Sequence, residues 1–273
     1  MSTVRNWTAG RVLSIVVLLI AAVVSVFPFV WMVVGSTLNP NEVLRGRLTP
    51  GGEFALNWSK ATTNYNLPRF FFNSIKIALL TVLFGLIVNG LAAYGFEKYP
   101  SKARDRVFGV LLLTLIIPQI ALVIPMFRMF AFFHLLDSHA AIILPSIMSI
   151  FIIFFMRQNF KMFPTEIIEA ARADGAGEFT IFLRIVTPSM QATYVSSAIY
   201  IFINQWNAYL WPLITILTDA KKTLPIAISS MMSAYTIEYG AIMVIVCISV
   251  LPVLILFLAL QKQFVAGLLG SVK

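Results

Sequence analysis

The sequence predicts an all-α membrane protein with six transmembrane helices. Hydrophobic residues make up 59% of the 273-residue chain, above the roughly 45–50% of an ordinary soluble domain. Charged residues make up 11% of the chain, where a soluble domain has about 25%. The few charges leave long uncharged runs, and a helix that crosses the hydrocarbon layer needs about 20 apolar residues. This composition excludes intrinsic disorder and argues against a soluble globule.

Six uncharged runs are long and apolar enough to predict membrane spans. We place the spans at about residues 12–36, 72–96, 107–127, 139–156, 190–217 and 239–261 of a single transmembrane domain, 1–273. The first run exceeds the core of a signal peptide and no cleavage site follows it, so a retained helix is expected. A further uncharged stretch, 223–237, has weak helical periodicity and is predicted to lie at the membrane interface.

The fifth run is too long for one upright helix. From Pro188 to Thr218 a continuous helix would be about 46 Å long, at about 1.5 Å per residue. The hydrocarbon layer is only about 30 Å thick. The helix must therefore tilt, break near Pro212 or begin in the cytoplasm.

The distribution of basic residues predicts the orientation. Cytoplasmic segments of membrane proteins carry an excess of Lys and Arg. This excess appears when both termini are placed in the cytoplasm, and the compact loop Glu97–Arg106 gives the strongest signal. The net charge of +9 then reports the topology of the chain in its membrane, and no nucleic-acid partner is expected. The single cysteine, Cys247, excludes an internal disulfide and a multi-cysteine metal site.

The longest predicted cytoplasmic loop, residues 157–187, contains a short surface helix. Thr165 is expected to cap the start of this helix, and Gly175 and Gly177 are expected to end it. Its apolar residues alternate with charges, and the acidic and basic residues of the loop cancel. A helix lying on the membrane surface would carry excess Lys and Arg. Docking into a groove of a partner protein is therefore the better interpretation.

This loop resembles the EAA motif of bacterial ABC importer permeases, E-A-A-x3-G-x9-I-x-L-P. The matching residues are Glu169, Ala170, Ala171, Gly175, Ile185 and Pro188, and the departure is Thr187 in place of Leu. The resemblance extends over nearly the whole chain. Segments 135–138, 206–212 and 261–268 resemble the carbohydrate-uptake branch, and the chain is most similar to the MalG-type subunit of maltose and glycerol-3-phosphate systems.

The resemblance implies a type I ABC importer permease fold and a division of labour between chains. The chain would be the permease subunit of an ATP-driven, binding-protein-dependent importer of a sugar or oligosaccharide, with glycerol-3-phosphate or another small polar solute as the alternative. Its partners would be a second permease subunit, a dimeric ABC ATPase and an extracytoplasmic solute-binding protein. The residues implied in ATPase coupling are Glu169, Ala170, Ala171, Asp174, Gly175, Ile185 and Pro188, with Glu169 as the charged anchor and Gly175 as the turn.

The chain itself is not expected to be an enzyme or to hold a cofactor. Its sequence contains no G-x-x-x-x-G-K-[ST] phosphate loop. ATP and Mg²⁺ are therefore expected in the separate ATPase, which would hydrolyse the ATP.

Polar residues in the fifth run are candidates for a substrate path. Tyr200, Asn204, Asn207 and Trp211 recur at i, i+4, i+7 and i+11, which predicts one face of a helix. Amides and aromatic rings suit a neutral sugar, because they bond hydroxyl groups and cover flat ring faces. The alternative is packing, since buried amides also join helices within a membrane.

Two other function classes lack their expected residues. An ion-coupled secondary transporter needs ionisable groups in mid-membrane, and the predicted spans have essentially none at their centres. A membrane-embedded enzyme would need a cluster such as His134, Asp137 and His139. The offsets of these three residues do not bring them onto one helical face, so no metal site is predicted. Asp137 or Ser138 is instead expected to cap the fourth span.

Overall fold

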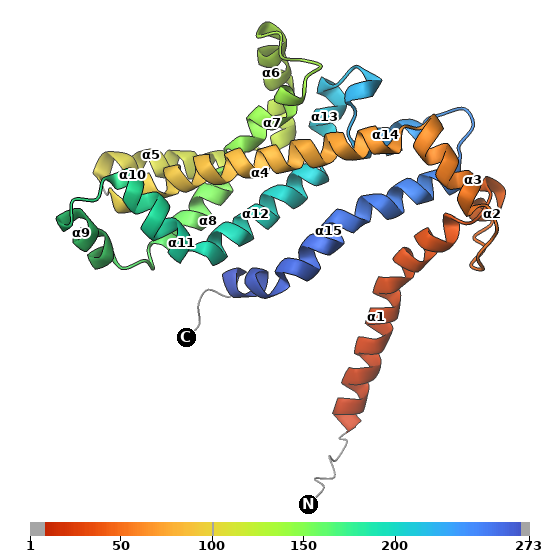
Figure 1. The fold of residues 1–273 in the computed structure, drawn as a ribbon, viewed down its shortest axis with the longest axis horizontal. Coiled ribbons are helices and arrows are strands. Elements are labelled where there is room, and N and C mark those ends of the chain that lie inside the picture. Colours follow the sequence, from red (N-terminus) through yellow and green to blue (C-terminus); the bar gives the residue numbers. More distant parts are fainter. Residues whose placement is uncertain (1–8, 100, 269–273) are drawn as a thin grey trace, which may run out of the picture. The chain divides into compact units, whose positions relative to one another are not determined.

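The computed structural model describes residues 9–99 and 101–268. The regular secondary structure of these residues is entirely helical, with no strand among them (Figure 1). Backbone contacts group the described residues into two compact units. Unit 1 comprises residues within 1–67 and 228–251, and unit 2 comprises residues within 68–227 and 252–273. Three helices, at 67–98, 224–232 and 239–268, contain residues assigned to both units. The single domain 1–273 stays a prediction.

The helices follow one another along the chain with short connections. They are α1 (Ala9–Gly35), α2 (Pro40–Leu44), α3 (Phe54–Ser59), η1 (Lys60–Asn64), α4 (Leu67–Lys98), α5 (Lys102–Leu113), η2 (Thr114–Ile116), α6 (Gln119–Phe132), α7 (His139–Ile147), α8 (Ile150–Phe160), α9 (Thr165–Ala173), α10 (Glu178–Ile181), η3 (Phe182–Val186), α11 (Thr187–Ser189), α12 (Gln191–Trp206), α13 (Leu210–Thr215), η4 (Asp219–Lys221), α14 (Leu224–Met232) and α15 (Tyr239–Leu268).

Four stretches of the described residues are helical and apolar over enough length to cross a membrane. They are Val12–Gly35, Leu67–Lys98, His139–Phe160 and Tyr239–Gln261, which correspond to the first, second, fourth and sixth predicted spans. A bent pair of helices makes a fifth if it is counted as one span. The predicted number of six is not reached by this measure, because the third run is divided at Pro118 and the fifth run between Trp206 and Leu210.

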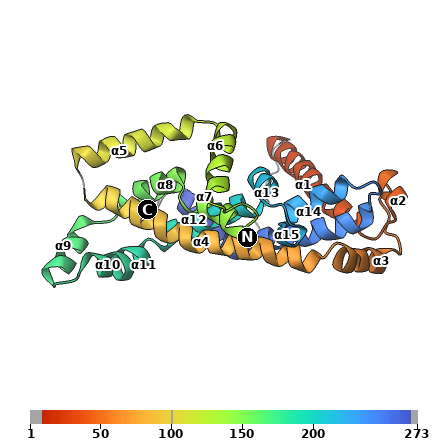
Figure 2. The ribbon, with the colours of Figure 1, turned by 90° about the horizontal axis from the view of Figure 1, so that it is seen from above.

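The third predicted span, 107–127, is a bent pair of helices. It is divided into Lys102–Ile116 and Gln119–Phe132, whose axes differ by 104° (Figure 2). Pro118 lies at the break, with ψ at 130°. Proline disfavours the helical conformation in the residue before it, and Ile117 is extended, with ψ at 121°.

The fifth predicted span, 190–217, is also divided. α12 ends at Trp206 and α13 begins at Leu210, so the structure shows a break near Pro212, one of the three alternatives for this run. In a continuous helix the ring of Pro212 would clash with the carbonyl of Ala208. α14 has 9 residues, about 14 Å at about 1.5 Å per residue, so it is too short to span, as predicted for 223–237.

The fourth predicted span contains a break between two helices, and a buried asparagine side chain bonds the backbone on both sides of it. α7 ends at Ile147 and α8 begins at Ile150, with extended backbone at Met148. Asn89 of α4 donates from Nδ2 to the Ile147 carbonyl at 2.8 Å and accepts at Oδ1 from the Ser149 amide at 2.8 Å. One side chain thus satisfies a backbone carbonyl and a backbone amide that the break leaves without helical partners.

In unit 1, a buried amide also holds the end of α1. Asn57 of α3 donates from Nδ2 to the carbonyls of Ser36 at 2.9 Å and Leu38 at 2.8 Å. Gly240 leaves room for this arrangement, because a Cβ there would lie 2.5 Å from the Leu38 carbonyl oxygen. Asn57 therefore supplies donors for carbonyls that follow the last turn of α1.

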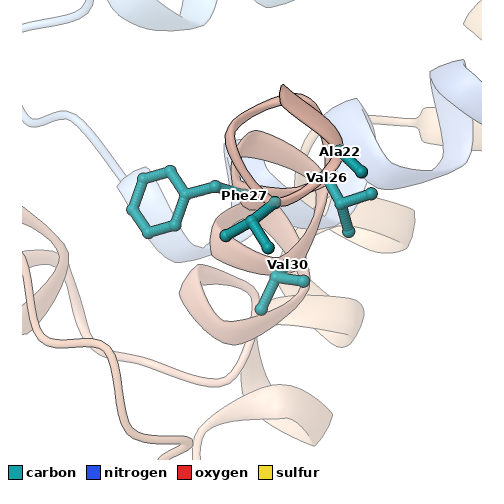
Figure 3. A pocket seen from close by; sticks show the side chains of 5 residues that line it. Ala22, Val26, Phe27 and Val30 are labelled. Atoms are coloured by element: carbon teal, nitrogen blue, oxygen red, sulfur yellow. The ribbon is translucent and has the colours of Figure 1, made fainter. Parts of the chain in front are cut away.

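The body of α1 carries an apolar surface that the described chain leaves uncovered. Figure 3 shows Ala22, Val26, Phe27 and Val30 around a shallow pocket that is lined by α1 alone. None of the most apolar window of Val12–Gly35 is buried inside the described structure. Such a surface suits contact with lipid tails or with another apolar helix.

In unit 2, apolar side chains at one end of the helices form a core. α8 packs against both α5 and α12 (Figure 1). The fully or almost fully buried members include Ala93 of α4, Ile152, Met156 and Phe160 of α8, Ile168 of α9, Ile181 of α10 and Val186 of η3. This core supports the loop between α8 and α12.

Candidate functional site

The helix predicted in the 157–187 loop is α9, at one end of unit 2 (Figure 1). The prediction that Thr165 caps this helix is wrong. Pro164 occupies the cap position, with φ at −59° and ψ at 125°, and no side chain bonds the free amides of the first turn. Proline fixes φ and favours this extended conformation, so Thr165 becomes the first helical residue. Glu166 lies in the first turn, where its negative charge interacts favourably with the positive end of the helix dipole.

The end of α9 is set by Gly175, as predicted. Gly175 has φ at +83°, the left-handed region that glycine adopts without strain. Its amide donates to the Arg172 carbonyl at 3.0 Å, and the Ala176 amide donates to the Ala171 carbonyl at 3.0 Å. These two bonds form a Schellman motif. The prediction for Gly177 is wrong, because it lies beyond this motif and occupies the N-cap position of α10.

The two faces of α9 divide the EAA residues. Ile168 and Ala171 are buried against the core of unit 2, with 1% and 8% of their surface exposed. Glu169, Ala170 and Asp174 are exposed. The structure therefore brings Glu169 and Ala170 together on an accessible surface and assigns Ala171 to holding the helix in place.

The last part of the motif forms an irregular turn. Residues Phe182–Val186 adopt a π-helix, in which the Thr187 amide donates to the Phe182 carbonyl. Pro188 then enters the first turn of α11. Because proline lacks an amide hydrogen and crowds the carbonyl four residues earlier, a regular helix is disfavoured here. Ile185 is half-buried and packs against the core of unit 2, whereas Pro188 is exposed.

A polar cluster beside α9 was not predicted from the sequence. Arg172 donates from Nε to Oε1 of Glu178 at 2.6 Å, and its guanidinium carbon lies 5.6 Å from the centre of the Tyr99 ring. Oε2 of Glu178 accepts from the Tyr94 hydroxyl at 3.3 Å. The Arg172 guanidinium, helped by Tyr99, holds the pKa of the Glu178 carboxyl below its usual range. The partners are separated by up to 84 positions, so no local pattern signals the cluster.

A second contact joins the same elements. Lys98, the last residue of α4, donates from Nζ to the Phe163 carbonyl at 2.9 Å. Phe163 lies two residues before α9 and has 6% of its surface exposed. The segments on both sides of α9 are therefore bonded to the end of α4. Phe163 before α9 accepts from Lys98, and Glu178 after α9 accepts from Tyr94.

The polar residues predicted on one face of the fifth span do not share one helix. Tyr200 and Asn204 lie on α12, Asn207 is its C-cap, and Trp211 belongs to α13. The prediction of one continuous face is wrong because the chain breaks before Pro212. Trp211 instead donates from Nε1 to the Ala141 carbonyl of α7 at 2.8 Å. This bond is helix-to-helix packing.

The other three members of the set remain accessible. Tyr200, Asn204 and Asn207 are exposed in the described chain. Asn204 donates to the Tyr200 carbonyl at 2.9 Å, and Asn207 donates to the Ile203 carbonyl at 3.0 Å. Each bond is to a carbonyl one turn earlier in the same helix. Neither bond uses the amide oxygen as an acceptor.

Asp137 joins two loops of unit 2. Its carboxylate accepts from the Leu217 and Thr218 amides and from Lys221 Nζ, at 3.0, 2.9 and 2.8 Å. The bond from Lys221, followed by those from Thr218, lowers the pKa of Asp137. Ser138, not Asp137, caps α7, because its Oγ accepts from the Ala141 amide at 3.2 Å. The carboxylate of Asp137 therefore accepts hydrogen bonds from the loop before α14 and does not cap α7.

These features describe a multi-pass α-helical membrane protein with an exposed helix between two membrane segments. A family model described as "Binding-protein-dependent transport system inner membrane component" matches residues 81–269. The chain belongs to this family of transport permeases, and the resemblance drawn from the EAA motif is confirmed.

Similar proteins agree in both sequence and fold. The chain is 46% identical to the lactose transport system permease protein LacG of Rhizobium radiobacter, over 94% of each chain. It is 34% identical to the arabinooligosaccharides transport system permease protein AraQ of Bacillus subtilis, over 90% of each chain. A crystal structure of a bacterial ABC transporter involved in alginate import matches with a TM-score of 0.84 and 21% identity, over 95% of this chain and 99% of that one. The all-α class and the type I ABC permease fold are thereby confirmed.

Proposed function

We propose that the chain is the permease subunit of an ATP-driven importer for a sugar or oligosaccharide. The observation that carries the proposal is the exposed face of α9, where Glu169 and Ala170 project from a helix that the core holds through Ile168 and Ala171. The names of the relatives, which transport lactose and arabinooligosaccharides, support a carbohydrate as the solute.

The exposed face of α9 supports docking to a separate dimeric ABC ATPase. A short amphipathic helix with one face free can lie in a groove of a partner. Glu169 would be the anchor in this groove, and Asp174 and Gly175 would set the direction in which the helix leaves it. ATP and Mg²⁺ would be bound and hydrolysed in the ATPase, since this chain has no phosphate loop. Closure of the ATPase dimer would then displace α9 and the helices tied to it.

The distribution of Lys and Arg supports an orientation with both termini and α9 in the cytoplasm. The loops held by Asp137 would then face the other side, where an extracytoplasmic solute-binding protein delivers the solute. A second permease subunit would complete the path through the bilayer. The uncovered apolar surface of α1 supports such a neighbour or lipid contact.

The solute and the energy source are tested by one uptake experiment. The chain is reconstituted in liposomes with its partner permease, ATPase and binding protein, and the uptake of labelled sugars is measured. We expect uptake of a di- or oligosaccharide that requires ATP on the ATPase side and the loaded binding protein. Uptake of glycerol-3-phosphate alone would support the alternative solute. Uptake that persists without ATP but follows an ion gradient would contradict the proposal.

The exposed amides of α12 and its C-cap support a role in the solute path. A polar amide in contact with lipid tails is costly unless another group satisfies it. Asn204 and Asn207 would therefore face water, a sugar or the second permease rather than lipid. The alternative role is packing against that permease. Trp211 is already bonded to α7, which favours packing for this residue.

Replacing both Asn204 and Asn207 by Ala is expected to reduce sugar uptake by at least about tenfold, because two hydrogen bonds to hydroxyl groups would be lost, each contributing about 1 kcal/mol. The complex is expected to assemble as the wild type does. Uptake and subunit co-purification are measured together. Loss of the second permease from the purified variant would show that the two amides act in packing.

A further inference from the structure

Two side chains of the proposed coupling helix α9 hold it in the core of unit 2. Ile168 and Ala171 are its buried residues. The chain enters it through Pro164 and leaves it through the left-handed Gly175. One narrow apolar stripe holds the helix from a single side, so these two side chains alone do not fix its rotation about its own axis. A helix that transmits a displacement needs a second attachment on another side.

The cluster around Arg172 provides this second attachment. Arg172 and Glu178 are joined at 2.6 Å, on opposite sides of the Gly175 turn. Glu178 is fixed in turn by the hydroxyl of Tyr94, a buried residue of α4 with 5% of its surface exposed. Tyr99 places its ring against the guanidinium. The cluster therefore ties both ends of the turn to the end of α4.

The chemistry of the cluster favours a defined geometry. An isolated exposed ion pair contributes little. Here the planar guanidinium both pairs with a carboxylate and packs on an aromatic ring, which restricts its orientation. The carboxylate is shared with a second donor, Tyr94, so that movement of one partner displaces the others.

We propose that Arg172 is a positioning residue which, with Glu178 and Tyr99, forms a joint that makes α4 follow the coupling helix. The proposal rests on the proposed coupling of α9 to an ATPase. Through this joint, closure of the ATPase moves the end of α4 together with α9. Farther along α4, Asn89 bonds both sides of the break between α7 and α8. The displacement thereby reaches the middle of the fourth span.

The joint is tested by the coupling ratio, the number of sugar molecules imported per ATP hydrolysed by the complete complex in liposomes. We expect Arg172→Ala to lower this ratio by roughly fivefold or more, the lower end of the usual range for coupling between two sites. The amount of ATPase that co-purifies is expected to stay at the wild-type level. A merely structural role would lower uptake, ATP hydrolysis and assembly together and leave the ratio unchanged, which would overturn the proposal.

A charge exchange distinguishes the pair from its individual residues. Arg172→Glu and Glu178→Arg are each expected to lower the ratio, and the double variant is expected to regain more than half of the loss, because the ion pair re-forms. Arg47→Ala is the matched control, since it removes an exposed ion pair with Glu42 far from α9 in the sequence. A double variant as poor as the single ones would overturn the proposal.

Hydrogen exchange of the α9 amides tests the joint without any sugar. In the purified complex, Arg172→Ala is expected to raise the exchange rate of the α9 amides by about tenfold. Local opening of α9 in the variant no longer has to break the contacts of Arg172 with Glu178 and Tyr99. Unchanged exchange would overturn the joint even if the wild-type complex imported no sugar. Failure of wild-type uptake with faster exchange in the variant would instead refute the proposed function and retain the joint.

Discussion

Replacing Glu169 by Lys is expected to abolish ATP-driven uptake and to release the ATPase from the complex. Glu169 is exposed on α9 and makes no hydrogen bond or ion pair within the described part of the chain. Its replacement therefore removes no internal contact, and an exposed substitution of this kind changes stability by about 0.5 kcal/mol or less. The effect must then arise at the surface that Glu169 presents to a partner.

The expected size follows from charge pairs at interfaces. Removing one partner of a desolvated pair costs about 2–5 kcal/mol, which corresponds to a loss of affinity of roughly 30-fold to more than 1,000-fold. Charge reversal adds repulsion to this loss. Both effects lower the fraction of complexes that hold an ATPase, and uptake falls with that fraction.

Co-purification of the ATPase and sugar uptake are the two measurements. Glu53→Lys is the matched control, because it makes the same charge change before α3, in a loop predicted to face the other side of the membrane. This control is expected to retain the ATPase. Normal ATPase binding and normal uptake in Glu169→Lys would refute the coupling role of α9.

Local sequence signals were sufficient to predict that α9 exists and that Gly175 ends it. Its turn at Gly175 depends on a property of one residue, the low cost of positive φ in glycine. Its buried stripe follows from the spacing of Ile168 and Ala171 along the helix. The spans were likewise predictable wherever one uncharged run forms one helix, as in α4 and α15.

Features that depend on contacts between distant segments could not be predicted. Pro118 is visible in the sequence, but proline is tolerated inside α1 at Pro28 and inside α15 at Pro252. Whether a proline breaks a span depends on which groups satisfy the freed backbone. The same limit applies to Trp211, whose bond to α7 joins residues 70 positions apart. For Thr165, the error was local, because Pro164 already fixes the extended position before the helix.

Asn89 is a side chain that satisfies freed backbone groups at a break in a span. Among the proposed substitutions, its replacement is expected to give the largest loss in the free energy of unfolding. Asn89 has 0% of its surface exposed. Its amide bonds the Ile147 carbonyl and the Ser149 amide across the break between α7 and α8, and also the Gly85 carbonyl in its own helix. In Asn89→Ala the first two groups lose their partner where water cannot replace it.

The expected loss is about 2–6 kcal/mol in the free energy of unfolding, since two buried groups are left unsatisfied and each costs about 1–3 kcal/mol. SDS titration of the purified chain in mixed micelles measures this free energy. Asn204→Ala is the matched control, because its amide donates only to a carbonyl one turn earlier in its own helix. A change of about 0.5 kcal/mol or less is expected for the control.

Asn89→Leu separates the lost hydrogen bonds from the cavity. Leucine has the same branching as asparagine and as many non-hydrogen atoms, but it neither donates nor accepts, so it fills the space while leaving the Ile147 carbonyl and the Ser149 amide unsatisfied. If the bonds across the break carry the stability, Asn89→Leu unfolds as easily as Asn89→Ala. If packing carries it, Asn89→Leu recovers most of the loss, because the cavity that remains after truncation is filled. Wild-type stability in Asn89→Leu would therefore refute the role of the amide in holding the divided span together.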